Sequence, residues 1–384
     1  MAFPAKFPLT KPNDIELSPA TARLYDLWGN KAEYDNEYYT RFKYSELEGF
    51  SDDGFISRRD PSKVLKIDGV YHVYYTCRNT GNALVPAGQD DDTHPSVDWD
   101  LADIYVATSR DGFIWNEIGP ALSRSSPGNF GCRSLTTPDV LPWDGRYYLY
   151  VQVYSDLIRH DACPVGVAVA DHPLGPFELQ ETEVIPQGAP GDWDNTSIHD
   201  PYPLIFGGKV YLYYKGAPET RNEADSIHLA QGVAIADSPL GPFTKCRSNP
   251  VLNSGHETML WPYREGVAAL QIRNGNEANT VQFAPNGTDF DLKAIVDMPP
   301  NAGGPYIPDL TADNRDGRGI LWGLSIGRPA YSGVYRSRLL RFDCSLSRDF
   351  ERPSFKEPKE YSDTQFLAFP LSEEDRDFMR SSED

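Results

Sequence analysis

The sequence has no apolar stretch long enough to cross a bilayer, which argues against a transmembrane helix. Its first residues, MAFPAKFPLTKPND, also lack the apolar core of a signal peptide. These two absences predict a cytoplasmic location, although removal of a leader would leave the same sequence.

Cysteine is scarce, and its pattern gives no sign of a disulfide framework or a zinc site. The five residues are Cys77, Cys132, Cys163, Cys246 and Cys344. Their number is odd, no two form a CxxC pair, and their spacings match no zinc motif. We therefore expect free, buried thiols in a reducing compartment.

Basic residues are too few to balance the acidic ones. The chain has 36 Lys and Arg against 56 Asp and Glu, a formal charge of −20. Such a field repels phosphate backbones and anionic lipids, so we expect no nucleic-acid or membrane partner. A neutral or cationic ligand fits better, although an acidic, soluble surface is by itself a sufficient reason for this charge.

Aromatic residues are abundant, at 12% of the chain, and 22 of them are Tyr. Flat rings with a polar edge suit the binding of sugars, and they suit the core of a β-sheet equally well. Composition alone does not decide between these uses.

The first 50 residues differ from the rest in their pattern of residue types, and this difference predicts a separate arm. Residues 1–14 are Pro-rich and extended, and Ser18-Pro19 then opens a helix over SPATARLYDLWGNKAE. Leu24, Leu27 and Trp28 form one apolar stripe on it. The next segment, EYYTRFKYSELEG, reads as a second helix.

The remaining chain is built from repeats of short aromatic strands. Three copies of one unit are RDPSKVLKIDGVYHVYYTC, TPDVLPWDGRYYLYVQVY and HDPYPLIFGGKVYLYYKG, and HETMLWPYREGVAALQIR and IPDLTADNRDGRGILWGLS are two degenerate ones. A second hairpin follows each copy, and ADHPLGPF and ADSPLGPF are nearly the same sequence. Two hairpins per unit, recurring about every 50–80 residues, are typical of propeller blades. We predict an all-β, five-bladed β-propeller over residues 51–365, with a tail over 366–384.

A long polar insertion, NTGNALVPAGQDDDTHPSVDWD, interrupts the first unit. We expect it to form a long loop over one face of the propeller.

One acidic residue opens each copy of the first unit. These residues are Asp60, Asp139, Asp200, Glu257 and Asp309. Residues at the same phase of every blade face the same axis, so we expect five carboxylates around one channel. For Asp139 and Asp309 the ordinary alternative, a carboxylate that caps a turn, is the favoured interpretation.

The sequence contexts of the other three acids suggest different roles. A neighbouring Arg would keep Asp60 ionised, as a general base requires. Asp200 would orient its neighbours and adjust the pKa of an acid. His256 and Glu257 together offer proton donors to one pocket, and an acid and a base across a channel are the groups that inverting glycoside hydrolysis needs.

The other histidines carry less weight. His72, His94, His160, His172 and His228 have the contexts of ordinary core or surface residues. His199 is intermediate, because it precedes one of the repeat-phase acids.

The ordered set of RRDPSKV, WDLADIYVATSRDG, TTPDVL, HDPYPL and GHETML resembles glycoside hydrolase family 117. That family contains the exo-acting α-1,3-neoagarooligosaccharide hydrolases, which are 3,6-anhydro-α-L-galactosidases. The resemblance extends from the arm through the fifth repeat. It implies an inverting propeller enzyme that removes 3,6-anhydro-L-galactose from the non-reducing end of neoagarobiose and longer neoagarooligosaccharides.

The resemblance also implies roles for individual residues. Asp60 is the general base, Asp200 the orienting carboxylate, and His256 the proton donor with Glu257 beside it. The residues expected to hold the terminal sugar are Trp99, Thr137, Gln152 and His199. The arm resembles a segment exchanged between two subunits, which implies a homodimer. No cofactor is required, and no ligand set in the sequence fixes a divalent cation near the axis.

Three other interpretations stay open. The same architecture serves glycosidases that act on arabinosides or galactans, and it serves non-catalytic carbohydrate-binding propellers. A glycoside phosphorylase would need a cluster of basic residues for phosphate, and the acidity of the chain argues against it.

Overall fold

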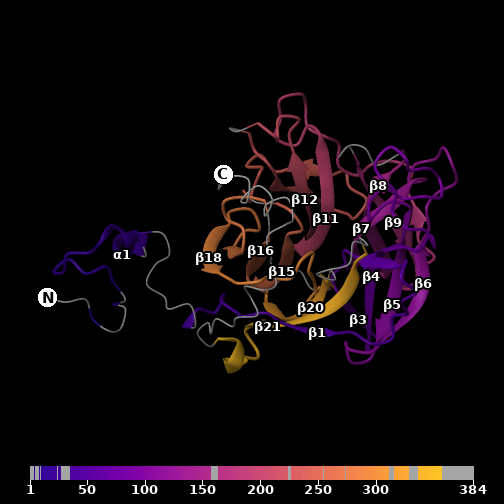
Figure 1. Ribbon diagram of the computed structural model, residues 1–384. Helices are drawn as coiled ribbons and strands as arrows, with labels where there is room; N and C mark the ends of the chain where they lie inside the picture. The colour runs from indigo at the N-terminus through magenta and orange to yellow at the C-terminus, as the bar shows by residue number, and fades with distance from the viewer. Residues whose placement is uncertain are drawn as a thin grey trace, which may run out of the picture.

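The computed structural model describes most of the chain (Figure 1). The described residues are 4, 8, 10–23, 25–26, 35–156, 163–223, 226–253, 255–272, 274–310, 315–327 and 336–356. Almost every regular element among them is a β-strand, so the prediction of an all-β fold is confirmed.

The first three sequence repeats each form a sheet of their own. The first contains β2 (Ser57–Arg59), β3 (Leu65–Ile67), β4 (Val70–Arg78), β5 (Ala102–Ser109) and β6 (Trp115–Leu122). The second contains β7 (Ser134–Trp143), β8 (Arg146–Tyr154), β9 (Val165–Ala170) and β10 (Glu178–Leu179). The third contains β11 (Ser197–Phe206), β12 (Lys209–Ala217), β13 (Ala230–Ala236) and β14 (Thr244–Lys245).

The last two repeats share one eight-stranded sheet. One half contains β15 (Met259–Arg264), β16 (Gly266–Gln271), β17 (Thr280–Ala284) and β18 (Asp291–Ile295). The other contains β19 (Gly304–Pro305), β20 (Gly317–Gly327), β21 (Arg338–Ser347) and β1 (Lys43–Glu46). The halves join where β15 pairs with β20 through two residues of each strand. Division at this contact gives one group of strands for each repeat, and the count of five blades depends on that division and stays a prediction.

The sheets follow one another around a common axis, as in a propeller. β7 contacts both β4 and β11, and β11 contacts β15. The ring closes where Val64, between the first sheet's inner strands, forms a parallel bridge with Tyr306 beside β19. The inner strands of all repeats therefore surround one axial region.

Two short sequence signals explain the repeated hairpins. Asp68-Gly69 and Asp144-Gly145 adopt positive φ values of 48° and 80°, and of 49° and 77°. Two successive positive φ angles give the tight turn whose twist matches antiparallel strands, and Asp-Gly favours it. The hairpins β3–β4 and β7–β8 therefore begin from local sequence.

A tyrosine at the same phase of three repeats ties each sheet to the next. The phenolic oxygen of Tyr74 donates to the carbonyl of Pro173, that of Tyr150 to Pro239, and that of Tyr213 to Gly287. Each acceptor lies in an outer turn of the following repeat. This shared contact accounts for one of the tyrosines that mark the repeat in the sequence.

The end of the predicted arm differs from the expectation. Residues 37–49 contain β1 rather than a second helix, and Lys43–Glu46 pairs antiparallel with residues 340–343 of β21. The unpaired edge of β21 supplies backbone partners that local propensity cannot anticipate. This pairing places an N-terminal and a C-terminal strand in one sheet.

The predicted helix begins where its sequence signals lie. α1 spans Pro19–Arg23, and the Ser18 hydroxyl accepts a hydrogen bond from the backbone of Thr21. The predicted stripe of Leu24, Leu27 and Trp28 and the predicted tail over 366–384 lie outside the described residues. Figure 1 shows α1 well apart from the sheets.

The remaining structural expectations have mixed outcomes. The polar insertion is a loop between β4 and β5, and Arg133 holds it by donating to Asp100 and to the carbonyl of Asp91.

All five cysteines are free, but Cys132 and Cys246 are only half-buried. No described helix is long and apolar enough to cross a membrane.

Candidate active site

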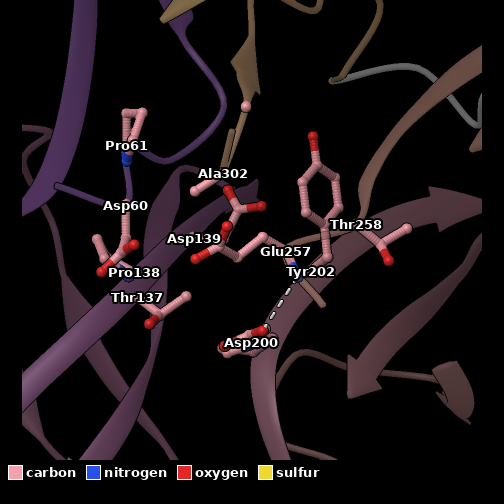
Figure 2. A pocket seen from close by; sticks show the side chains of 12 residues that line it. Asp60, Pro61, Thr137, Pro138, Asp139, Asp200, Tyr202, Glu257, Thr258 and Ala302 are labelled. Atoms are coloured by element: carbon pink, nitrogen blue, oxygen red, sulfur yellow. Dashed lines mark hydrogen bonds between the residues drawn. The ribbon is translucent and has the colours of Figure 1, made fainter. Parts of the chain in front are cut away.

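A pocket lies on the axis and takes its walls from all five repeats (Figure 2). Its lining residues are Asp60, Pro61, Thr137, Pro138, Asp139, Asp200, Pro201, Tyr202, Glu257, Thr258, Ala302 and Gly303. They come from the segments that open the first four predicted repeats and from residues just before the predicted start of the fifth. The prediction that such segments meet at an axis is therefore confirmed for the first four repeats.

One backbone conformation recurs once in each repeat at this pocket. The φ angles are 49° at Asp60, 46° at Thr137, 47° at Asp200, 57° at Glu257 and 47° at Ala302. A residue other than glycine in this left-handed region costs on the order of 1–3 kcal/mol, and such strain gathers at functional sites. The recurring strain identifies the structurally equivalent position of every repeat.

This equivalence corrects the phase assigned to two acids. Thr137 and Ala302, not Asp139 and Asp309, occupy the position that Asp60 holds in the first repeat. In the first three repeats the equivalent residue directly precedes a proline, whereas Asp139 follows one. The pocket therefore has three equivalent carboxylates, and the expectation of five was wrong.

The two remaining acids are both engaged in ion pairs. Asp139 lies in the pocket wall, and its Oδ1 is 2.7 Å from the Nζ of buried Lys63. Asp309 is away from the pocket, with its Oδ1 2.7 Å from the Nε of Arg318. Both arrangements fit the ordinary structural interpretation of these residues.

Asp60 is buried and forms an ion pair with its own neighbour in the chain. The Nε of Arg59 is 2.7 Å from Asp60 Oδ2, and Arg59 Nη2 donates to Oδ1 at 3.2 Å. Burial raises the pKa of Asp60, Arg59 opposes this shift, and Glu257 and Asp200 add to it. The expected Arg is present, but it does not hold the pKa below its ordinary value. A carboxylate with a raised pKa is a stronger base once ionised.

Asp200 has the opposite electrostatics. Its Oδ2 is 2.8 Å from the Nζ of Lys215, which comes from the neighbouring strand β12. Burial alone would raise the pKa of Asp200, but Lys215, His256 and His199 outweigh it and lower the pKa to about 2. Asp200 is thus an anion at neutral pH and supplies a fixed negative charge beside His256.

Glu257 connects these two carboxylates. Its backbone N–H donates to Asp200 Oδ2 at 3.4 Å, the contact drawn in Figure 2. Its Oε1 lies 3.8 Å from Arg59 Nη2 and 3.7 Å from His256 Nε2. The His256 side chain is 31% exposed, so it can meet a ligand from the open side.

The four residues expected to hold a sugar lie around this cluster at different depths. Thr137 lines the pocket, and its hydroxyl donates to Oε1 of Gln152, which stands behind it. Trp99, at the end of the polar insertion, stacks its ring against the Arg59 guanidinium at 4.8 Å. His199 is buried and pairs with Lys215 across the β11–β12 ladder. Their contact with a sugar remains a prediction.

Sequence reasoning missed two cations of the site. Lys215 belongs to a strand dense in Tyr, and pairing the hairpin β11–β12 would have placed it opposite His199. Lys63 lies three residues after Asp60, but its partners Asp139 and Pro203 belong to other repeats. No local pattern could have identified those partners. Among the described residues, no group of three or more His, Cys, Asp or Glu is placed to hold a metal ion.

The chain matches no protein-family model and no curated protein sequence. Among solved structures it is similar to Zg3597, a family 117 glycoside hydrolase of the marine bacterium Zobellia galactanivorans. The two are 41% identical with a TM-score of 0.81, and the alignment covers 88% of this chain and 100% of that one.

More distant similarities show the fold alone. CoXyl43, a family 43 β-xylosidase/α-arabinofuranosidase from a compost metagenome, is 17% identical with a TM-score of 0.52, covering 79% of this chain and 94% of that one. A family 62 α-L-arabinofuranosidase of Coprinopsis cinerea is 12% identical with a TM-score of 0.51, covering 82% and 99%. These neighbours agree with an all-β fold of the propeller type. Together with its identity to Zg3597 over nearly the whole chain, this fold makes the protein a glycoside hydrolase of family 117.

Proposed function

We propose that this hydrolase is exo-acting and inverting, and that it cleaves the α-1,3 bond of neoagarobiose and neoagarooligosaccharides. The products would be 3,6-anhydro-L-galactose from the non-reducing end and the shortened sugar. One observation carries the proposal: Asp60, Asp200 and Glu257, from three different repeats, meet beside His256 in one pocket with different electrostatic surroundings. Groups whose environments separate their pKa values are suited to separate acid and base roles.

Asp60 is the proposed general base. A water molecule gives a proton to the Asp60 carboxylate while its oxygen forms a bond to the anomeric carbon. The raised pKa of Asp60 favours this proton transfer, and the Arg59 ion pair fixes the direction of the carboxylate. Attack from the face opposite the leaving group inverts the anomeric configuration.

His256 is the proposed acid. As the glycosidic bond breaks, the His256 imidazolium gives its proton to the leaving oxygen, so the sugar leaves as a neutral alcohol. Asp200, held as an anion by Lys215, favours the protonated ring. Glu257 adds a carboxylate oxygen at 3.7 Å from the same ring. Asp60 then loses its proton to solvent and His256 regains one.

The test is incubation with neoagarobiose, with products followed by chromatography and the released anomer by NMR. Release of 3,6-anhydro-L-galactose and galactose with inversion would support both substrate and mechanism. No release from the folded protein would refute the substrate and direct a screen to arabinosides and galactans, then to sugar binding without turnover. A rate that depends on phosphate would indicate a phosphorylase instead.

We also propose that the protein is a homodimer formed through its N-terminal arm. The position of α1 apart from the sheets supports this, because so short a helix needs other surfaces to stabilise it (Figure 1). A second copy of the chain would supply such a surface.

A further inference from the structure

A line of hydrogen bonds extends from His256 away from the pocket. The His256 Nδ1 lies 2.8 Å from Oδ1 of Asn274, and the Nδ2 of Asn274 lies 3.2 Å from Nε2 of His228. The Nδ1 of His228 in turn lies 3.3 Å from the backbone carbonyl oxygen of Arg221. The third and fourth repeats thus meet in a chain of side chains that ends at the proposed acid.

The carbonyl at the end of this chain fixes the direction of every bond in it. A carbonyl oxygen only accepts, so His228 Nδ1 carries a hydrogen and, in the neutral ring, Nε2 is an acceptor. Asn274 must then donate to His228 through its amide nitrogen, which turns its amide oxygen toward His256. That oxygen also only accepts, so the hydrogen of the contact belongs to His256 Nδ1.

We propose that Asn274, oriented by His228, is a positioning residue that keeps a hydrogen on Nδ1 of His256. The nitrogen that gains and loses the proton is then Nε2, which faces Glu257 at 3.7 Å. This inference rests on the proposed function, because it assigns the proton of the acid to one atom. A second-layer partner that holds one ring nitrogen commonly decides which form of a histidine is present.

The benefit to the acid is both directional and electrostatic. The ring can give up its Nε2 proton and remain bonded to Asn274 through Nδ1, so it need not turn during the reaction. Among the described residues, the charged and titratable groups that face it or its neighbour Glu257 belong to three repeats, and they are Arg59, Asp60, His199, Asp200, Lys215, His228 and Glu257. His228 reaches the Nδ1 side, and it does so through Asn274.

The backbone of Asn274 offers a matched pair of variants. Its φ is 61°, and Asn279 nearby has φ 62°, so glycine is tolerated at both positions. Asn274→Gly removes the amide that contacts His256, and Asn279→Gly is the control. Asn274→Asp keeps an acceptor for Nδ1 and adds a charge, and His228→Ala frees the amide to turn over.

The direct readout is the tautomer of His256, measured by long-range proton–nitrogen NMR on protein labelled at histidine and assigned with His256→Gln. The wild type and Asn279→Gly should show Nδ1–H in the neutral ring. Asn274→Gly should shift the ring toward Nε2–H, and His228→Ala should shift it less. Asn274→Asp should retain Nδ1–H.

Kinetics on neoagarobiose give the second readout. We expect Asn274→Gly to lower kcat about tenfold with KM within about twofold, as for loss of a residue that orients a catalytic ring. In Asn274→Asp the alkaline limb of the kcat profile should move to higher pH, since the added carboxylate stabilises the imidazolium.

An unchanged tautomer in Asn274→Gly would overturn the inference, whatever the activity. An activity retained in His256→Gln would instead refute the proposed acid, and the tautomer measurement would still decide the role of Asn274. The two failures are therefore separable.

Discussion

Two buried aspartate–lysine ion pairs lie close to the axis, and they differ in the groups that surround them. Asp139 and Lys63 are 2.7 Å apart, and Asp200 and Lys215 are 2.8 Å apart. Lys63 is fully enclosed: its Nζ also donates to the carbonyl oxygens of Val140 and Pro203 and lies over the Tyr202 ring. Burial lowers the pKa of Lys63 to about 8 and raises that of Asp139.

In the second ion pair, between Asp200 and Lys215, the aspartate is held as an anion. Asp200 faces Lys215, His256 and His199, and their coulombic effect lowers its pKa to about 2. The chemical role of each ion pair therefore depends on the groups that surround it. Both aspartates line the pocket, but the Lys63 pair joins three repeats and contacts backbone carbonyls, whereas the Lys215 pair lies among titratable groups.

The largest effect should come from Asp60, which shares the pocket with the second pair. Asp60→Asn should lower turnover about 10²- to 10⁴-fold, because the attacking water loses its base. Folding, measured by circular dichroism and urea titration, should be little changed. Asp309→Asn is the control, since this acid pairs with Arg318 outside the pocket. Activity retained in Asp60→Asn would remove Asp60 from the mechanism.

Breaking the enclosed pair should mainly reduce stability. Lys63→Met leaves the Asp139 carboxylate buried without its cation, which should cost about 3–5 kcal/mol of unfolding free energy. The double variant Lys63→Met/Asp139→Leu should recover most of this loss. Urea unfolding measures both, and a single variant as stable as the wild type would contradict a structural role for the pair.

Breaking the pocket pair should mainly reduce activity. Lys215→Met removes the strongest opposing charge, so the pKa of Asp200 rises and the negative charge beside His256 is held less firmly. We expect kcat/KM to fall about 10- to 100-fold, the range seen when a supporting residue is lost. If stability instead falls as far as in Lys63→Met, the distinction between the pairs fails.

The stability contributions of Asp200 and Asp139 should depend on pH with opposite signs. The pKa of Asp200 is lowered on folding, so its contribution is present above about pH 4 and is lost as the pH falls toward 2. That contribution amounts to about 2 kcal/mol. The pKa of Asp139 is raised, so its contribution runs the other way and is lost as the pH rises. Urea unfolding at pH 3 and pH 6 should show a weaker fall with acid in Asp200→Asn than in the wild type; an equal fall would contradict this.

Removal of the arm should have the smallest effect on the two ion pairs and on turnover. Deleting residues 1–34 spares β1 and the contact of Asn36 with the Lys293 carbonyl, whereas deleting 1–50 would remove a strand of the sheet. Light scattering should show a monomer, with turnover per chain within about twofold, since the described pocket residues all lie beyond residue 50. A dimer that survives the deletion would refute the role proposed for the arm.

The sequence predicted which side chains reach the axis where the repeat signal was strong. Asp60 and Asp200 stand before proline in matching motifs, and both reach the pocket as expected. The prediction failed in the second repeat, where the acid follows the proline, so that Thr137 rather than Asp139 took the equivalent position.

The sequence alone determined the features that arise within a few residues. The Asp-Gly turns, the alternation of aromatic strands and the helix start at Ser18 depend on local backbone preference and on burial of apolar side chains. These features can therefore be predicted from short segments of sequence.

Only the tertiary structure decided which distant groups meet. Asp139 meets Lys63 and Asn274 meets His228 across neighbouring repeats, and β1 meets β21 although the two strands lie near opposite ends of the chain. Electrostatic and hydrogen-bond energies fall off within a few ångströms, so the role of each charged residue depends on neighbours that the order of the chain does not reveal.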